Sequence, residues 1–184
     1  MRNWTLTLRA LLLAVLGLLV ACGSKPPPKI EIPTDQILLS GQIAASADVN
    51  PDPGGVPAPV LVRVYELASD DVFNRTDFFS LFDHEQAVLG AALLRAREFQ
   101  LVPGQVVDIS GQVEPRTQFI GAIAAVRDLD AARWRATAPL PGKTVRPSEP
   151  HRVEAQVAVG RGGVTIALGA AGTNANAGAA DVPR

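Results

Sequence analysis

The chain has 184 residues and a formal net charge of −1 at neutral pH, with 17 Lys and Arg against 18 Asp and Glu. A chain so close to neutral lacks the basic surface that binding to nucleic acid phosphates requires. Cys22 is its single cysteine, which excludes an intramolecular disulfide and a metal site built from several cysteines.

The first 21 residues have the pattern of a secretory signal peptide. Arg2 and Arg9 give a positive start, and the apolar run over residues 10–20 is shorter than the roughly 20 residues that a spanning helix needs. The run ends in Leu-Val-Ala-Cys, which has the form of a lipobox. We therefore expect cleavage before Cys22, which removes two arginines and leaves a net charge of −3.

The sulfur of Cys22 is the expected site of a covalent lipid. One acyl chain binds a membrane only marginally, whereas the three chains expected at such a cysteine form a durable anchor. Gly23 follows the cysteine, where Asp favours inner-membrane retention, so we expect the outer membrane, facing the periplasm. The alternatives are an ordinary signal peptide with an incidental cysteine and an uncleaved N-terminal helix.

Composition divides the remaining chain into three parts. Residues 22–35 are rich in proline, which favours extended polyproline II and predicts a semi-rigid spacer behind the lipid. Residues 169–184 are mostly Ala, Gly and Asn, too poor in large apolar side chains to join a core, and are predicted to be a disordered tail. Residues 36–168 are predicted to form one domain.

Apolar residues in this domain alternate with polar ones at the period of half-buried strands. Strands are expected over residues 37–45 and 60–67, and a near-continuous apolar run over 119–126 predicts a central strand. Residues 134–140 are a further candidate, and 152–159 and 164–168 are predicted to pair as a hairpin across Gly160-Arg161-Gly162-Gly163.

Pro103-Gly104 has the residue order that a type II turn prefers. The turn is expected to pair residues 99–101 with 105–113, where Val107, Ile109 and Val113 alternate with polar side chains. About eight strands with short connections predict a mainly β fold, an antiparallel two-sheet sandwich.

One segment departs from the strand pattern. Four of the six phenylalanines lie within residues 71–83, Thr76 or Asp77 can cap a helix there, and Phe78 and Phe82 share a helical face. We predict a short helical insertion packed on a sheet, with a second helical turn possible at residues 130–133. The alternative is a cradle around a small ligand, formed by Phe78, Phe79, Phe82 and Trp134.

The search for catalytic or metal-binding motifs finds little. His84-Glu85 begins a zinc-protease pattern, but Val88 stands where the second histidine is required, so His84 is read as a surface residue. Residues 48–54 resemble the start of a calcium loop, yet Pro53 occupies the glycine position. Asp128 and Asp130 are expected to cap a turn. We therefore expect no enzyme, no metal and no cofactor other than the covalent lipid on Cys22.

The connection between the first two expected strands is the candidate recognition element. It contains four prolines and two glycines, and prolines lower the entropy lost when a loop is ordered on a partner. An inert solvated loop is the alternative. The candidate partner-binding residues are Asp48, Val49, Asn50, Pro51, Asp52, Pro53, Gly54, Gly55, Val56, Pro57, Ala58 and Pro59.

Short motifs in a fixed order carry a family resemblance over residues 37–168. They are Val-Arg-Val-Tyr-Glu-Leu at 62–67, Phe73-Asn74, the Phe-rich run at 77–83, Val-Leu-Gly at 88–90, Pro103-Gly104, Ala-Ala-Val-Arg-Asp at 124–128 and Ala-Arg-Trp-Arg at 132–135. With the lipobox and spacer ahead of them, the sequence resembles the TssJ family, the outer-membrane lipoproteins of bacterial type VI secretion systems.

The resemblance implies a transthyretin-like β-sandwich with a helical addition, held at the outer membrane and facing the periplasm. The family binds the periplasmic C-terminal region of TssM, which joins TssL in the inner membrane, and its loop between the first two strands contributes to that contact. In this sequence the loop corresponds to residues 48–59, while the tail has no family counterpart. The rival hypothesis is a periplasm-facing lipoprotein that binds a small ligand in a sandwich pocket.

Overall fold

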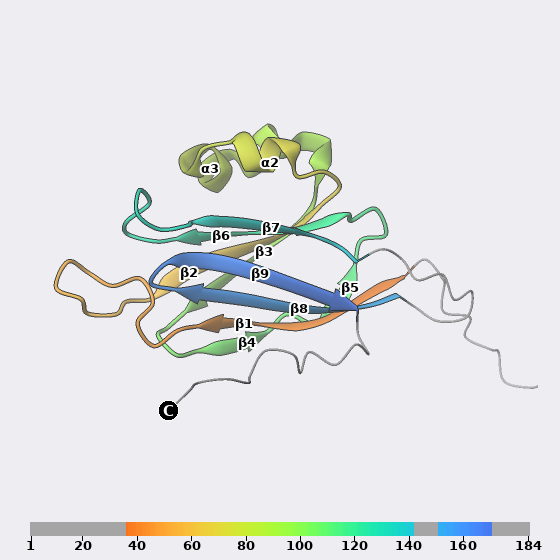
Figure 1. The fold of residues 1–184 in the computed structure, drawn as a ribbon. Helices are drawn as coiled ribbons and strands as arrows, with labels where there is room; N and C mark the ends of the chain where they lie inside the picture. The colour runs from red at the N-terminus through yellow and green to blue at the C-terminus, as the bar shows by residue number, and fades with distance from the viewer. Residues whose placement is uncertain (1–35, 142–150, 171–184) are drawn as a thin grey trace, which may run out of the picture. The chain divides into compact units, whose positions relative to one another are not determined.

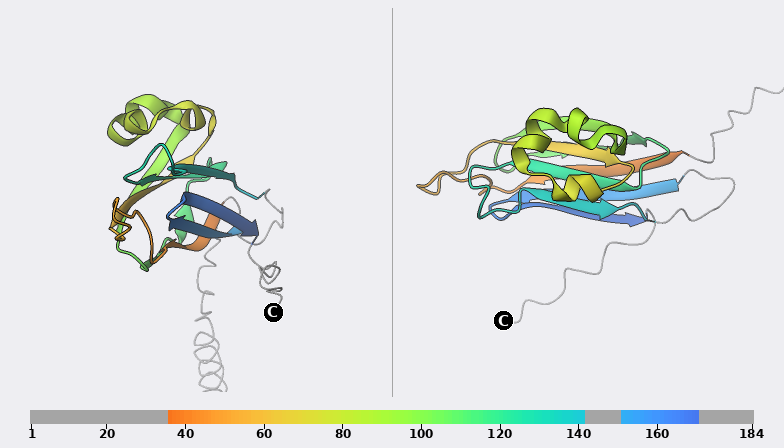
Figure 2. Two further views of the ribbon diagram at one scale, coloured as in Figure 1. Left: turned by 60° about the vertical axis from the view of Figure 1, so that its left-hand side comes forward. Right: turned by 90° about the horizontal axis from the view of Figure 1, so that it is seen from above.

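The computed structural model describes residues 36–141 and 151–170 (Figure 1). Within these ranges the chain forms nine strands, two α-helices and one 3-10 helix. The strands build two sheets packed face to face, and the helices cover the outer face of one of them (Figures 1 and 2). The predicted sandwich with a helical insertion is confirmed. No helix in the described ranges is long and apolar enough to cross a membrane.

The first sheet has the strand order β4-β1-β8-β9, with β5 also paired to β1. β1 (Ile37–Ala45) lies between β8 (His151–Gly160) and the short strands β4 (Val106–Asp108) and β5 (Gly111–Val113). β9 (Gly163–Ala170) forms the predicted hairpin with β8. β1 and β8 run parallel, an orientation that alternation of apolar residues does not reveal, because both directions have the same period.

The second sheet has the order β3-β2-β6-β7, and all its pairs are antiparallel. It consists of β2 (Val60–Leu67), β3 (Leu93–Leu101), β6 (Phe119–Ala125) and β7 (Arg135–Pro139). β6 is central, as its near-continuous apolar sequence predicts. The observed bounds of β1 and β2 are those expected from the sequence.

The predicted pairing across Pro103-Gly104 is wrong, although the turn itself forms. Gln105 N donates to Val102 O at 3.0 Å, and Gly104 has φ 78°, as a type II turn requires. The turn joins β3 of the second sheet to β4 of the first, where β4 pairs with β1 instead. The expected strand over 105–113 is also divided into β4 and β5.

Two apolar cores hold the layers together. The core between the sheets is built from inward-facing aliphatic residues of both sheets, whereas the second core lies between β2, β6 and the helices. β2 contributes Val62 and Val64 to the first core and Tyr65 and Leu67 to the second. Both of its faces are therefore covered, which explains its apolar sequence.

The helical insertion is longer than the predicted residues 71–83. α2 (Asp71–Arg75) is followed by α3 (Phe78–Leu89) and the 3-10 helix η1 (Gly90–Ala92). The side chain of Asp77 caps α3 by accepting a hydrogen bond from Ser80 N at 3.0 Å, as expected. α3 has a kink at the non-helical residue His84, whose side chain is exposed.

Two boundaries differ from expectation. Residues 130–133 form no helix. Asp128 instead caps an isolated turn. Its side-chain Oδ1 accepts from Ala131 N at 3.0 Å, and its backbone carbonyl accepts from Ala132 N at 3.1 Å. β9 continues through Gly169 and Ala170, so the first two residues assigned to the tail belong to the sheet. Cys22, the signal peptide, the spacer and residues 171–184 lie outside the described residues.

Candidate partner-binding surface

The loop between β1 and β2, residues 48–59, projects beyond one end of the sandwich (Figures 1 and 2). Its central residues 53–57 are exposed, and 61% of the surface of Val56 is accessible. Val49 and Asn50, by contrast, are buried at 0% and 7% exposure. The expectation that all residues of the loop can contact a partner is therefore wrong at Val49 and Asn50, which are buried, and Val49 packs into the core between the sheets.

Hydrogen bonds close the base of this loop. Ala58 N donates to Val49 O at 3.2 Å, and Asn50 Nδ2 donates to Pro59 O at 2.7 Å. Asn50 Oδ1 accepts from Arg127 N at 2.8 Å, which connects the loop to the β6–β7 loop, residues 126–134. Asn50 also has φ 48°, a left-handed conformation that Asn tolerates better than most residues.

A second set of hydrogen bonds fixes the tip. Asp52 N donates to Val56 O at 2.9 Å, and Gly55 N donates to Asp52 O at 2.9 Å. The side chain of Asp52 accepts from Val56 N, also at 2.9 Å. Gly55 has φ 84°, which glycine adopts without steric cost. The loop is thus a structured finger with an exposed valine near its end.

The turns beside the finger are bonded to its base. Ser46 O accepts from Gly104 N at 3.2 Å, and Ser46 N donates to Val159 O at 2.8 Å. The hydroxyl of Ser46 donates to Asp48 at 2.6 Å, which holds the pKa of that carboxyl below its ordinary value, with Arg161 adding to the effect. Arg161 pairs with Asp48 at 3.4 Å, although such an exposed pair contributes little stability.

The β6–β7 loop is bonded in turn to the β8–β9 turn. Arg133 N donates to Gly162 O at 3.0 Å, and Val164 N donates to Arg133 O at 2.8 Å. These bonds form an isolated parallel bridge between the two sheets. Hydrogen bonds therefore connect the finger, the β3–β4 turn, the β6–β7 loop and the β8–β9 turn at one end of the domain.

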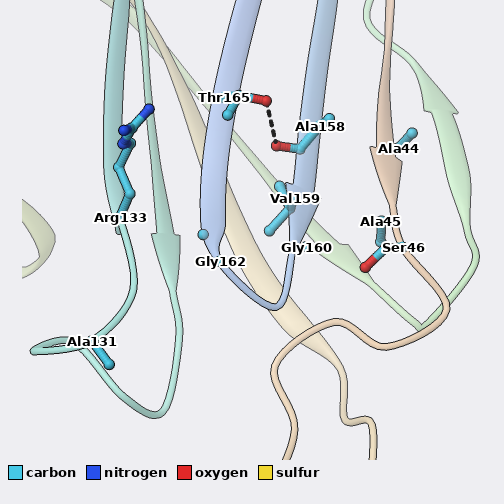
Figure 3. Close-up of a pocket in the computed structure, with 11 residues that line it drawn as sticks. Ala44, Ala45, Ser46, Ala131, Arg133, Ala158, Val159, Gly160, Gly162 and Thr165 are labelled. Atoms are coloured by element: carbon cyan, nitrogen blue, oxygen red, sulfur yellow. Dashed lines mark hydrogen bonds between the residues drawn. The ribbon is translucent and has the colours of Figure 1, made fainter.

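A depression of about 640 Å³ lies beside these turns (Figure 3). Thr165 and Ala158 come from neighbouring strands of its wall, joined by a hydrogen bond from Thr165 Oγ1 to Ala158 O at 3.5 Å (Figure 3). The lining consists mainly of small side chains, with Arg133 as its charged member: Ala44, Ala45, Ser46, Ala131, Arg133, Ala158, Val159, Gly160, Gly162, Gly163 and Thr165. The depression lacks the convergent polar groups typical of a small-molecule site.

The aromatic residues of the rival ligand pocket pack against one another. The Phe78 ring stacks on Phe82 at a centroid distance of 5.2 Å and meets Trp134 edge-on at 5.4 Å and Phe79 edge-on at 5.5 Å. The guanidinium of Arg63 lies 4.9 Å from the Phe82 ring centroid. Phe78, Phe82 and Trp134 pack together in the core under α3, where the alternative placed a ligand, whereas Phe79 is exposed. In the described ranges no group of three or more His, Cys, Asp or Glu residues could hold a metal.

Two contacts at this end were not foreseen from the sequence. The bond between Asn50 and Arg127 joins residues 77 positions apart, and the bridge between Arg133 and Gly163 joins the two sheets. A local signal existed for each, since Asn before Pro51 suits a turn and Gly163 suits a hairpin end. Neither signal identifies the distant partner.

The fold is a transthyretin-like β-sandwich with a helical addition, and its hydrogen-bonded loops gather at one end of the domain. Residues 38–162 match the family model of the type VI secretion lipoproteins described as VasD, EvfM and TssJ. This match extends from β1 to the β8–β9 turn. The chain therefore belongs to the type VI secretion lipoprotein family, and the resemblance seen in its sequence is confirmed.

Solved structures agree with this assignment. The lipoprotein TssJ1 of the Pseudomonas aeruginosa type VI secretion system is 32% identical, with a TM-score of 0.67 over 74% of this chain and 98% of that chain. Lip of Serratia marcescens, a membrane-bound component of the type VI secretion system, is 35% identical, with a TM-score of 0.66 over 73% and 99%.

A chain from a structure described as a type VI membrane complex is 23% identical, with a TM-score of 0.58 over 71% of this chain and 97% of that chain. This last likeness supports the fold alone. No curated protein matches the sequence.

Proposed function

We propose that this lipoprotein anchors the membrane complex of a type VI secretion system at the outer membrane by binding the periplasmic C-terminal region of TssM. Through TssM it would be joined indirectly to TssL in the inner membrane. The observation that carries the proposal is the finger of residues 48–59, whose base and tip are closed by hydrogen bonds while Val56 is 61% exposed. A stiff projecting loop with an apolar tip suits protein recognition.

The anchoring half of the proposal concerns Cys22. The lipobox supports a thioether-linked lipid on its sulfur, and the proline-rich residues 22–35 would then serve as the spacer between the lipid and the sandwich. Several acyl chains make such attachment durable. The Serratia relative, described as membrane-bound, is consistent with this arrangement.

The role is that of a binding and anchoring protein rather than a catalyst. The lipid on Cys22 is the one group added to the chain under this proposal, and it acts by holding the protein in the outer membrane. The finger would supply the contact with TssM on the periplasmic side. The mature charge of −3 gives no reason to expect a nucleic acid partner.

A matched pair of variants tests the partner contact. Val56→Ser removes the apolar group from the finger, and Phe79→Ser removes one from α3, where Phe79 is 64% exposed. Val56 lies outside both cores, so Val56→Ser should unfold at the temperature of the unmodified protein. Phe79→Ser loses the edge-on contact with Phe78 and should unfold at a slightly lower temperature. Binding of the TssM periplasmic region, measured by surface plasmon resonance, should weaken for Val56→Ser and stay unchanged for Phe79→Ser.

Membrane cross-linking tests the assembly in the cell. Lipidated protein purified after mild cross-linking should bring with it an inner-membrane protein that has a long periplasmic region, identified by mass spectrometry. Shortening residues 53–57 should abolish that recovery while the sandwich stays folded. Recovery of TssM with the shortened finger would exclude the finger as the contact, and recovery of no inner-membrane partner by the unmodified protein would overturn the proposal.

A further inference from the structure

We infer that Asn50 is a positioning residue for the proposed TssM contact, fixing the finger against the β6–β7 loop so that its exposed tip is presented in one orientation. The inference rests on the proposed function, since it concerns the same surface. It differs from that function in assigning the effect to a buried residue that lies at the base of the finger, away from the exposed tip.

The contacts of Asn50 use both ends of its carboxamide. Nδ2 donates to Pro59 O at 2.7 Å, across the base of the finger. Oδ1 accepts from Arg127 N at 2.8 Å, outside the finger. The residue is 7% exposed, and buried hydrogen bonds of this kind hold their geometry because a lost partner leaves a desolvated polar group behind.

The backbone of Asn50 restricts the choice of residue further. Its φ of 48° lies in the left-handed region, which glycine, asparagine and aspartate enter most readily. Glycine would keep the conformation and lose both hydrogen bonds. Aspartate would keep an acceptor for Arg127 N but could not donate to Pro59 O while ionised. Alanine would lose the bonds and strain the backbone.

Few other polar groups can fix the finger against the β6–β7 loop. Its prolines have no N–H to donate, and the bonds of the Asp52 turn lie within the finger itself. The pair between Asp48 and Arg161 has side chains 56% and 60% exposed, so solvent weakens it. Val49 also holds the base by packing in the core between the sheets, and the carboxamide of Asn50 is the buried hydrogen-bonded link between the finger and the β6–β7 loop.

Loss of this link should reduce the fraction of molecules whose finger is ready to bind. Apparent affinity falls in proportion to that fraction, while contacts in the final complex are unchanged. The loss should therefore appear as slower association with TssM, roughly tenfold for Asn50→Ala, with an unaltered dissociation rate. A residue that contacted the partner directly would instead accelerate dissociation.

The experiment measures binding kinetics of the lipidated full-length mature chain, in detergent, with the TssM periplasmic region. Asn50→Ala and Asn50→Gly should both associate more slowly, because both lose the bonds to Pro59 O and Arg127 N. Amide exchange at Arg127, followed by NMR, should accelerate in both variants. The Gly variant keeps the test informative if Asn50→Ala does not fold, because glycine adopts the left-handed backbone of this position without strain.

Gly121→Ala provides a control for general destabilisation. A Cβ at this β6 position would lie 3.1 Å from side-chain atoms of Leu67 and Phe73, in the core under the helices. The variant should unfold at a lower temperature and still associate with TssM at the rate of the unmodified protein.

The inference would be overturned if the Arg127 amide exchanged faster in Asn50→Gly while this variant still associated with TssM at the unmodified rate. It would also be overturned if the variants dissociated faster from TssM with an unchanged association rate. Absence of TssM binding by the unmodified protein would refute the proposed function instead. In that case exchange at Arg127 would still show whether Asn50 fixes the finger.

Discussion

Gly163 lies directly against the backbone of Arg133, so close that a Cβ at position 163 would overlap the Arg133 carbonyl group. Its φ of 108° is also one that side chains rarely adopt. The contact forms the bridge between the β6–β7 loop and the β8–β9 turn, and it requires glycine on both counts.

Gly163→Ala should therefore destabilise the domain by more than about 1 kcal/mol, because the new methyl group displaces the Arg133 backbone and strains its own. Gly162→Ala is the matched control, since nothing lies within 4 Å of a Cβ at position 162. Urea unfolding followed by tryptophan fluorescence checks the difference. Equal midpoints for the two variants would contradict the close contact at Gly163.

Arg135 of β7 should be required for the docking of α2. Its guanidinium donates to Phe73 O at 2.7 Å and to Thr76 O at 2.6 Å, and burial lowers its pKa without removing its charge at neutral pH. Arg135→Met should cost about 1–3 kcal/mol by leaving these carbonyls unpaired. Arg75→Met, at an exposed position of α2, should have little effect in the same thermal unfolding measurement.

Asp77 should make stability sensitive to acid. The hydrogen bond from the Ser80 hydroxyl, followed by that from its backbone N–H, holds the pKa of Asp77 below the ordinary value of an aspartate. A carboxyl with a lowered pKa stabilises the fold above its unfolded value, and this contribution disappears as the pH falls through the folded value. Asp77→Asn keeps a capping group that does not titrate. The unfolding temperature of Asp77→Asn should approach that of the unmodified protein as the pH falls from neutral into the acidic range where the Asp77 carboxyl is protonated, and parallel pH profiles would refute the effect.

Cys22→Ser should release the protein from the outer membrane without changing the fold. Cys22 lies outside the described domain, so the serine variant should give the circular dichroism spectrum and unfolding temperature of the unmodified sandwich. Membrane fractionation should no longer recover it with the outer membrane, because no thiolate remains to take the lipid. Continued recovery with outer membranes would refute the anchor at Cys22.

The strands were predicted from sequence where local signals define them. β1 and β2 have the expected bounds because apolar alternation meets turn residues at their ends. Pro103-Gly104 specified its turn, yet a turn constrains only local backbone and does not choose which sheet the next strand joins.

The candidate site was predicted only in part, because local sequence signals do not identify contacts between distant residues. Proline content identified the finger, whereas the burial of Val49 and the bond from Arg127 N to Asn50 depend on residues distant in the sequence. The parallel pairing of β1 with β8 was likewise out of reach, because it joins segments more than 100 residues apart.

That parallel pairing determines how the domain would respond to tension. β1 begins at Ile37 and ends at Ala45, just before the finger. Under the proposed anchoring role, a pull between the lipid on Cys22 and a partner at the finger would therefore act on the two ends of this strand. All nine of its residues pair with β8 on one side, while β4 and β5 pair with it on the other. Hydrogen bonds on both sides would then be strained together in shear, whereas a strand peeled from an edge loses them one at a time. Extraction of β1 would therefore require breaking its hydrogen bonds to neighbours on both sides.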